Sequence, residues 1–223
     1  FHVHHTGSTE MPKLAVNTEK LIARFGPDMI PFLFKEILEA DTESAVYFGK
    51  SLARNGVVGL DFILEKMGEH RMHDHDLINI MQVFSFFKIP EVAKAIPAIL
   101  KESQHHNHQV TAMGLYSVGR LVQKLRPTIF SEELRSTIFD TVFRFLSHSQ
   151  GLVRKNAART LGKMLRKGLL SRENEQKLYK TFLAIAGRDE HHNWDRAFIV
   201  RREAEDFLPY FCQSSLHVRQ YSQ

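Results

Sequence analysis

Histidine is concentrated in short polar segments of this sequence, and imidazole is a common ligand of transition metals and a group that changes charge near neutral pH. Nine of the 13 histidines lie in these segments: His70, His73, His75, His105, His106, His108, His148, His191 and His192. Carboxylates stand among them, and mixed nitrogen and oxygen ligands suit zinc, nickel or copper. The histidines therefore raise two chemical hypotheses, metal binding and a response to mild acidification.

The spacing of the histidines matches no specific metal motif. His73 and His75 are two residues apart in an expected turn, and nothing has the helical i, i+4 pair of a zinc protease. We therefore expect no dedicated metal site and no cofactor. The residues that would hold an adventitious ion are His73, His75, His105, His106 and His108. Sensing of pH by the same histidines is kept as an alternative, in which mild acid loosens the protein or strengthens anion binding.

Lysine and arginine form a second group with a chemical consequence. Spacings of four, four and three residues place Lys155, Arg159, Lys163 and Arg166 on one face of a helix, opposite its apolar residues. The predicted partner-binding residues are Arg120, Lys124, Lys155, Arg159, Lys163 and Arg166. A strip of this kind attracts acidic peptides, phosphoryl groups or a nucleic-acid backbone. The alternative is a solvated helix face that only favours solubility.

Sequence motifs of catalysis are missing. No glycine-rich phosphate loop, nucleophile elbow or cofactor fingerprint occurs, so we do not expect an enzyme. Asp195 follows Trp194 at an expected helix start, where we interpret its charge as a partner of the positive helix end. The single cysteine, Cys212, excludes an intramolecular disulfide and suits a buried position in a reducing compartment.

Ten helices would position these side chains. Apolar residues recur at the helical period, and no run alternates as a strand would. The expected helices are Asp28 to Ala40, Glu43 to Asn55, Gly59 to Glu69, Asp74 to Lys88, Glu91 to Ser103, His108 to Leu125, Ser131 to Ser147, Leu152 to Lys167, Ser171 to Gly187 and Trp194 to Phe211. A short helix from Asn17 to Phe25 precedes them. We expect a flexible arm over 1–16, a repeat domain over 17–212 and a tail over 213–223.

The helices pair into about five repeats. The second helix of each pair aligns on Ala45, Leu77, Val110, Val153 and Val200. The residue four positions further on is Gly49, Met81, Gly114, Ala157 and Ala204, and four of these five are small. A small residue that recurs on a buried helical face, at a period of this size, is typical of helical solenoids.

One segment carries a family resemblance. The sequence SQGLVRKNAARTLGKML, from Ser149 to Leu165, resembles the second helix of a HEAT repeat, and Val200 to Ala204 repeats its first half. Val110 to Gly119 keeps the apolar spacing without the arginine. The resemblance implies an all-α, right-handed α-α superhelix of HEAT/armadillo type, whose second helices line the concave surface. In that family the equivalent arginine bonds within the stack, so we expect Arg154 and Arg201 to be structural.

Two HEAT-like enzyme families are similar to the chain in architecture. Deoxyhypusine hydroxylases hold two irons with His-Glu dipeptides, whereas this sequence has only the reverse order, as in Glu69-His70 and Glu190-His191. Alkyl-purine DNA glycosylases resemble it in size and basic concave surface. Their catalytic aspartate works beside several aromatics, and here Trp194-Asp195 is the single candidate pair. A nucleic-acid-binding protein related to these glycosylases is therefore an alternative.

The charge of the two helix layers favours a binding protein. The formal net charge is +5, and the sequence pI is about 9.3. The first helices of the pairs are net acidic, and the second helices are net basic. No stretch reaches the roughly 20 apolar residues of a membrane span. We expect a cytoplasmic scaffold or regulatory module that holds an acidic protein segment on its concave surface, with a nucleic-acid backbone as the second choice and no membrane insertion.

Overall fold

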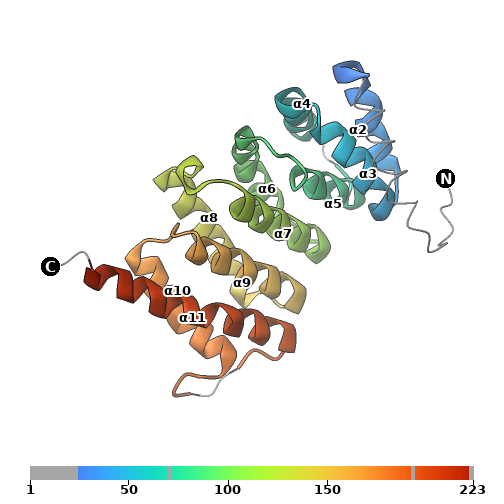
Figure 1. The fold of residues 1–223 in the computed structure, drawn as a ribbon. Helices are drawn as coiled ribbons and strands as arrows, with labels where there is room; N and C mark the ends of the chain where they lie inside the picture. The colour runs from blue at the N-terminus through green and yellow to red at the C-terminus, as the bar shows by residue number, and fades with distance from the viewer. Residues whose placement is uncertain (1–24, 70–71, 192–193, 221–223) are drawn as a thin grey trace, which may run out of the picture. The chain divides into compact units, whose positions relative to one another are not determined.

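The computed structural model describes residues 25–69, 72–191 and 194–220, with side chains of the last range described up to Phe211. This part of the chain is all-helical and contains no strand (Figure 1). None of its helices has the length and hydropathy needed to cross a bilayer. The predicted arm over 1–16, nearly all of the short helix from Asn17 and the side chain of Cys212 lie outside the described residues. The chain divides into two compact units between Ile89 and Pro90.

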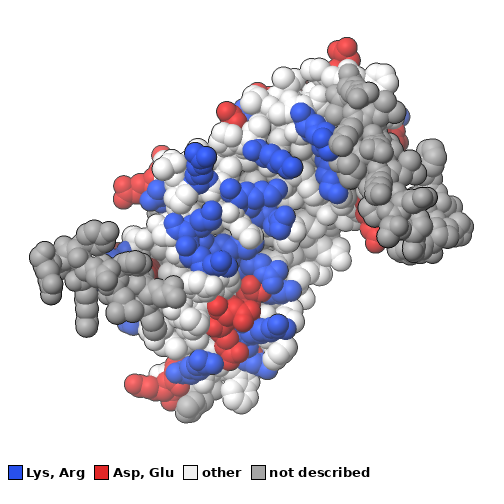
Figure 2. Space-filling model, in the orientation of Figure 1, with Lys and Arg blue, Asp and Glu red and all other residues white. Residues whose placement is uncertain are grey.

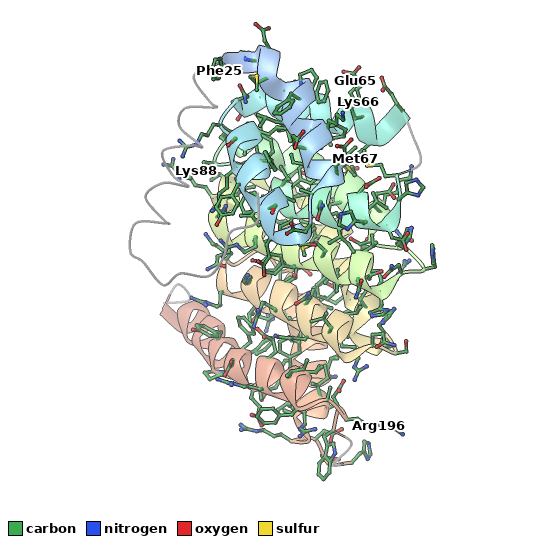
Figure 3. The ribbon with its side chains drawn as sticks, turned by 90° about the vertical axis from the view of Figure 1, so that its right-hand side faces the viewer. Phe25, Glu65, Lys66, Met67, Lys88 and Arg196 are labelled. Atoms are coloured by element: carbon green, nitrogen blue, oxygen red, sulfur yellow. The ribbon has the colours of Figure 1, made fainter. Side chains whose placement is uncertain are left out.

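The first unit contains four α-helices after a short 3₁₀ turn. They are η1 (Gly26–Met29), α2 (Ile30–Glu39), α3 (Thr42–Ala53), α4 (Gly56–Glu69) and α5 (Asp74–Phe84). α2, α3 and α5 pack against one another, and α4 packs mainly against α3 and α2. On α4, Lys66, which is labelled in Figure 3, donates to Glu69 with 2.6 Å between Nζ and Oε2. The sequence pairs α4 with α5, whereas the main neighbours of α4 precede it in the chain.

The second unit contains the regular helix pairs. Its elements are η2 (Pro90–Ala95), α6 (Ile96–Glu102), α7 (His108–Lys124), η3 (Pro127–Ile129), α8 (Glu132–Arg144), η4 (Phe145–Ser147), α9 (Gly151–Arg166), α10 (Arg172–Ala186) and α11 (Phe198–Gln220). α9 packs between α7 and α11, and α6, α8 and α10 each pack against the helix that follows them (Figure 1). The three expected helix pairs of this unit are therefore observed.

Helix starts and ends follow from local chemistry. The hydroxyl of Ser131 accepts a hydrogen bond from the N–H of Leu134 at 3.2 Å, which confirms the predicted N-cap of α8. Ser171 caps α10 in the same way through Asn174, also at 3.2 Å. α10 ends at Gly187, whose φ of 70° is a left-handed conformation that glycine adopts without strain. Short polar side chains and glycine thus fix these boundaries near their predicted places.

The bounds of α11 differ from the prediction at both ends. The helix begins at Phe198 rather than Trp194, and its backbone continues to Gln220 rather than ending at Phe211. Pro209 lies inside it. A polar sequence predicted a tail after Phe211, but polarity alone does not stop a helix, and no glycine or proline follows in that segment.

Each second helix of this unit is preceded by a turn that is closed by the same two hydrogen bonds. The fully buried residues Val110, Val153 and Val200 give the register. Five residues earlier, a side chain accepts from the N–H two residues on: His105 from Asn107 at 3.1 Å, His148 from Gln150 at 3.0 Å, and Asp195 from Ala197 at 2.8 Å.

The second bond of the turn comes from the residue after the valine. Its side chain donates to the carbonyl of the same turn residue: Thr111 to His105 at 3.2 Å, Arg154 to His148 at 2.7 Å, and Arg201 to Asp195 at 2.6 Å. Three turns with unlike residues therefore have one construction. The structural role expected for Arg154 and Arg201 is confirmed for both.

Small residues set the distance between successive second helices. Gly114, Ala157 and Ala204, which stand at the aligned fourth position, are all buried. Glycine is also needed further along: a Cβ at Gly119 would lie 2.6 Å from Oγ1 of Thr160, and a Cβ at Gly162 would overlap the ring of Phe207. These contacts leave no space for a methyl group between α7, α9 and α11.

Replacement of Gly162 by alanine should therefore destabilise the second unit. The added methyl meets the side of a buried ring, so we expect a loss of about 1–3 kcal/mol in the free energy of unfolding. Urea denaturation of the full chain measures it. Gly68→Ala is the control, because Gly68 is exposed in α4 with nothing near its Cβ position. The control should be neutral or slightly stabilising, and equal behaviour of the two variants would contradict the close approach of α9 and α11.

Candidate anion-binding surface

The residues predicted to hold an acidic partner lie on two adjacent helices of the second unit. Arg120 and Lys124 are on α7, and Lys155, Arg159, Lys163 and Arg166 are on α9. We call these six residues the basic strip. Because α7 and α9 pack against each other, the fold brings both groups onto one face, where Figure 2 shows Lys and Arg gathered over these two helices.

The shared register of α7, α9 and α11 aligns the basic strip with residues that were not predicted to bind a partner. Six residues after the buried valines stand Tyr116, Arg159 and Asp206. Ten residues after them stand Arg120, Lys163 and Tyr210. Arg159 interacts electrostatically with Tyr116 and Asp206, so the first row joins α7, α9 and α11. Lys163 interacts with Arg120, so the second row joins α7 and α9.

Arg159 is paired within the protein. Its Nε and Nη2 donate to the two carboxylate oxygens of Glu203 at 2.8 and 2.6 Å, in a bidentate ion pair between α9 and α11. Glu203 is buried, with 7% of its surface exposed. A buried carboxylate needs such a partner. Arg159 was predicted as a partner-binding residue, and the structure gives it an internal partner as well.

Lys163 is the most perturbed group of the basic strip. Burial first, and then the charges of Arg159, Arg120 and Arg166, lower its pKa to about 8, and Glu203 opposes them. The side chain is half-buried. Positive charge is thus more crowded at Lys163 than one internal carboxylate compensates.

The other members of the basic strip surround this point. The Nε of Arg120 is buried and has no hydrogen-bond partner among the described residues. The guanidinium of Arg166 lies over the ring of Tyr210, 5.0 Å from its centroid, and is exposed on its other side. Lys155 is half-buried and Lys124 is exposed. Lys124 and Arg166 are thus the exposed members of the basic strip, and Arg120 and Lys163 lie deeper.

The basic strip does not continue onto α11. That helix carries Glu203, Glu205 and Asp206, and Figure 2 shows acidic groups there beside the Lys and Arg of α9. The prediction of one basic layer came from the summed charge of the second helices. A sum does not show the order of the charges, so the acidic end on α11 was not predicted. The signal was present in the register, since Glu203 and Asp206 follow Val200 at the spacings that face α9.

Arg154 forms a second ion pair at the opposite end of α9. Its Nε and Nη2 donate to the carboxylate of Asp195 at 2.5 and 2.7 Å, and both side chains are largely buried. Burial alone would raise the pKa of Asp195, but hydrogen bonds from Arg154 and the N–H of Ala197 lower it below its ordinary value. The pair lies in a shallow pocket that exposed Trp194 and Arg196 also line (Figure 3 labels Arg196).

Asp195 does not stand at the helix start, where it was expected. α11 begins three residues later, at Phe198, so Asp195 lies in the turn and not in the first turn of the helix. Its carboxylate binds Arg154 and also accepts from the N–H of Ala197, the residue directly before α11. Both carboxylate oxygens are used by protein groups, which leaves little of this acid for the catalysis considered under the glycosylase alternative.

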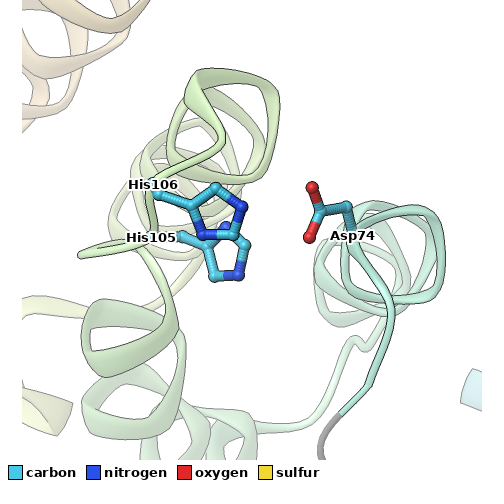
Figure 4. Close-up of side chains that lie close together, drawn as sticks. All are labelled: Asp74, His105 and His106. Atoms are coloured by element: carbon cyan, nitrogen blue, oxygen red, sulfur yellow. The ribbon is translucent and has the colours of Figure 1, made fainter.

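Most of the described candidate metal ligands have local contacts. In the first unit, Nε2 of His75 lies 2.9 Å from the carbonyl of Ala40, and His73 is exposed. In the second unit, the rings of His105 and His106 stack with centroids 4.2 Å apart (Figure 4), and His108 begins α7. His70 and His192 lie outside the described residues.

The Nδ1 atoms of His105 and His148 accept backbone hydrogen bonds, which requires that these nitrogens carry no proton.

Comparison with known proteins assigns no family. A scan against protein-family models and a search of curated proteins both give no match. Function therefore has to be inferred from the geometry of the chain itself.

Removal of the Asp195 charge should destabilise the second unit strongly. Asp195→Asn leaves the guanidinium of Arg154 buried without its carboxylate, so we expect a loss of about 3 kcal/mol at pH 7. The pKa of Asp195 is lower in the folded than in the unfolded chain. The difference in free energy of unfolding between wild type and variant is therefore complete above a pH of about 4, the pKa in the unfolded chain. It disappears as the pH falls through the pKa in the folded chain. Urea denaturation at pH 7 and pH 3 measures the loss of stability and its decrease in acid. Asp140→Asn, at an exposed position of α8, should change stability little, and a loss as large as that at Asp195 would argue against a special role of the pair.

The turn role of His148 makes a separate prediction. His148→Ala removes the acceptor for the N–H of Gln150 and should cost about 1 kcal/mol. In His148→Asn the side-chain oxygen accepts from the N–H two residues on, as in an Asx turn, so stability should be largely retained. Thermal unfolding compares the two variants, and equal losses would show that the imidazole matters for another reason.

Proposed function

We propose that this chain is a non-enzymatic HEAT-like binding module, a right-handed helical superhelix that holds an acidic protein segment on the α7 and α9 face. We assign it to the cytoplasm in the same proposal, since a chain with one cysteine suits a reducing compartment. The observation that carries the proposal is the crowding of positive charge around Lys163. Three guanidinium groups interact with its ammonium group, and one buried carboxylate offsets them.

Crowding of this kind is unfavourable to folding. A half-buried ammonium whose pKa is lowered to about 8 is held in a charged state that its surroundings disfavour at neutral pH. Binding sites often retain such arrangements at a cost in stability. A carboxylate from a partner would relieve the repulsion, so the same groups that destabilise the free protein favour the complex.

The dimensions of the basic strip favour a short acidic segment. From Lys155 to Arg166 the helix rises by about 16 Å, and neighbouring helices are about 8–10 Å apart. The acidic residues of α11 close one side. A surface of this size accommodates a few carboxylates. Of the six residues of the basic strip, Arg159 is already paired with Glu203, which leaves five for the phosphates of a duplex. This number is small beside the roughly 6–10 phosphate contacts of proteins whose DNA binding depends steeply on salt.

A nucleic-acid backbone is the second candidate, and salt separates it from an acidic peptide. Binding to a polyphosphate releases condensed counterions, so affinity falls steeply with salt concentration. A short peptide has no comparable counterion atmosphere. Duplex and single-stranded oligonucleotides are therefore included in the binding test below.

Charge reversal at Lys163 should abolish binding without loss of the fold. A glutamate at this position would lie among Arg120, Arg159 and Arg166, so the folded state accepts it, while an external anion is repelled. We expect the affinity for a fluorescent polyglutamate peptide to fall at least about tenfold. Fluorescence anisotropy measures binding, and thermal unfolding checks the fold. Arg159→Glu is a poor variant for this purpose, since it would place a second carboxylate against buried Glu203.

Lys180→Glu is the matched control. Lys180 is exposed on α10, in the other helix layer, and the change in net charge is the same. The control should bind the peptide within about twofold of wild type, because distant exposed charges are screened. Equal losses in both variants would reduce the effect to net charge, and wild-type binding of oligonucleotides but not of the peptide would favour the second candidate.

A further inference from the structure

Lys163 is a half-buried amine on which three guanidinium groups and one carboxylate act. Its neighbours come from every helix of its layer that packs against α9: Arg120 from α7, Arg159 and Arg166 from α9 itself, and Glu203 from α11. On α9, Arg159 precedes Lys163 by four residues and Arg166 follows it by three, so all three share one face. Three of the four charged neighbours are positive.

We propose that the amine of Lys163 is a carbamylation site, at which carbon dioxide adds to Nζ and the resulting carboxylate is stabilised by Arg120 and Arg166. The lone pair of the neutral amine forms a bond to the carbon of CO₂, and one C=O π bond becomes the negative charge of the product. The nitrogen releases one proton to water. The product is Lys–NH–COO⁻, and no oxidant or reductant takes part.

The electrostatics of the basic strip favour this product over the free lysine. Carbamylation replaces a positive group that three guanidinium groups repel with a negative group that they attract. Arg120 is suited to this role because its Nε is buried without a hydrogen-bond partner in the described part of the chain. Glu203 is the one neighbour that would repel the carbamate, and its charge is compensated by the bidentate bonds from Arg159.

The protonation of Lys163 supports the same reaction. Only the neutral amine attacks CO₂. With a pKa lowered to about 8, mainly by burial, about a fifth of the Lys163 side chains are neutral at pH 7.4. The ordinary lysine pKa leaves fewer than about one side chain in a thousand neutral. The half-buried position also leaves a path for a small molecule such as CO₂.

Carbamylation would regulate the binding surface. If the basic strip binds an acidic segment, as proposed above, a carbamate at its centre occupies the guanidinium groups and repels the segment. This consequence rests on the proposed function, whereas the modification itself does not. Bicarbonate would therefore weaken peptide binding at constant ionic strength.

Chemical trapping tests the modification directly. The full chain is equilibrated at pH 7.4 with ¹³C-labelled bicarbonate, ethylated with triethyloxonium to fix any carbamate, digested and analysed by mass spectrometry. We expect labelled ethyl carbamate at Lys163 at least roughly fivefold above the level at exposed Lys180, given the difference in neutral fraction. Lys163→Arg should remove that signal and leave Lys180 unchanged. Labelling of Lys163 at the level of Lys180 would overturn the proposal.

The stabilising arginines are tested by substitution. Arg120→Gln removes both a repulsion that keeps the amine neutral and a partner of the carbamate, so labelling of Lys163 should fall several-fold while Lys180 is unaffected. If thermal unfolding shows that this variant is misfolded, Arg166→Gln replaces it, because Arg166 is exposed at the end of α9. Unchanged labelling in a folded variant would contradict stabilisation by these groups.

A second arm distinguishes the modification from the proposed function. Binding of the polyglutamate peptide is measured in bicarbonate and in chloride of matched ionic strength. Weaker binding in bicarbonate by wild type, but not by Lys163→Arg, supports the regulatory role. Peptide binding with no excess label at Lys163 would refute carbamylation alone, and label at Lys163 with no peptide binding in either salt would refute the proposed function alone.

Discussion

The close approach of α7, α9 and α11 is the constraint on which the second unit depends. Gly119 and Gly162 leave no room for a methyl group against Thr160 and Phe207, so the three helices have one spacing and one register. That register decides which charges become neighbours. It places Arg120 beside Lys163 and Glu203 beside Arg159. Positive charge is therefore crowded at Lys163 and compensated at Arg159 because of how the helices pack, and not because of the composition of any single helix.

Much of the fold could be predicted from the sequence, because its signals are local. Periodic apolar residues, N-caps such as Ser131 and the left-handed Gly187 set most helix bounds in the second unit within a few residues. The first unit was less predictable, since α4 packs mainly on α3 and α2, and no local pattern encodes that choice. The end of α11 was missed for a related reason: a helix that continues into a polar segment gives no stop signal.

The candidate site was predictable in position and not in detail. Spacing on one helix was enough to group Lys155, Arg159, Lys163 and Arg166. The pairing of Arg159 with Glu203 joins residues 44 positions apart, so it depends on how two helices are aligned. The histidines show the same limit. His105 and His148 suggested metal chemistry by their type, whereas their contacts make them interchangeable in role with Asp195, as acceptors that close a turn.

The two interfaces of α9 differ in kind. Towards α7, the acceptors are backbone carbonyls: Asn156 donates to Ala112 at 2.7 Å, Thr160 to Leu115 at 2.9 Å, and Lys167, just after α9, to Leu125 at 3.3 Å. Towards the last helix pair, the links are the carboxylates of Asp195 and Glu203. Where stacked helices contact mainly their neighbours, stability is close to a sum of nearest-neighbour couplings. Strong acid removes both carboxylate charges between α9 and the last helix pair, and none between α9 and α7. We therefore expect α10 and α11 to separate first from the second unit, while α7 and α9 remain packed together.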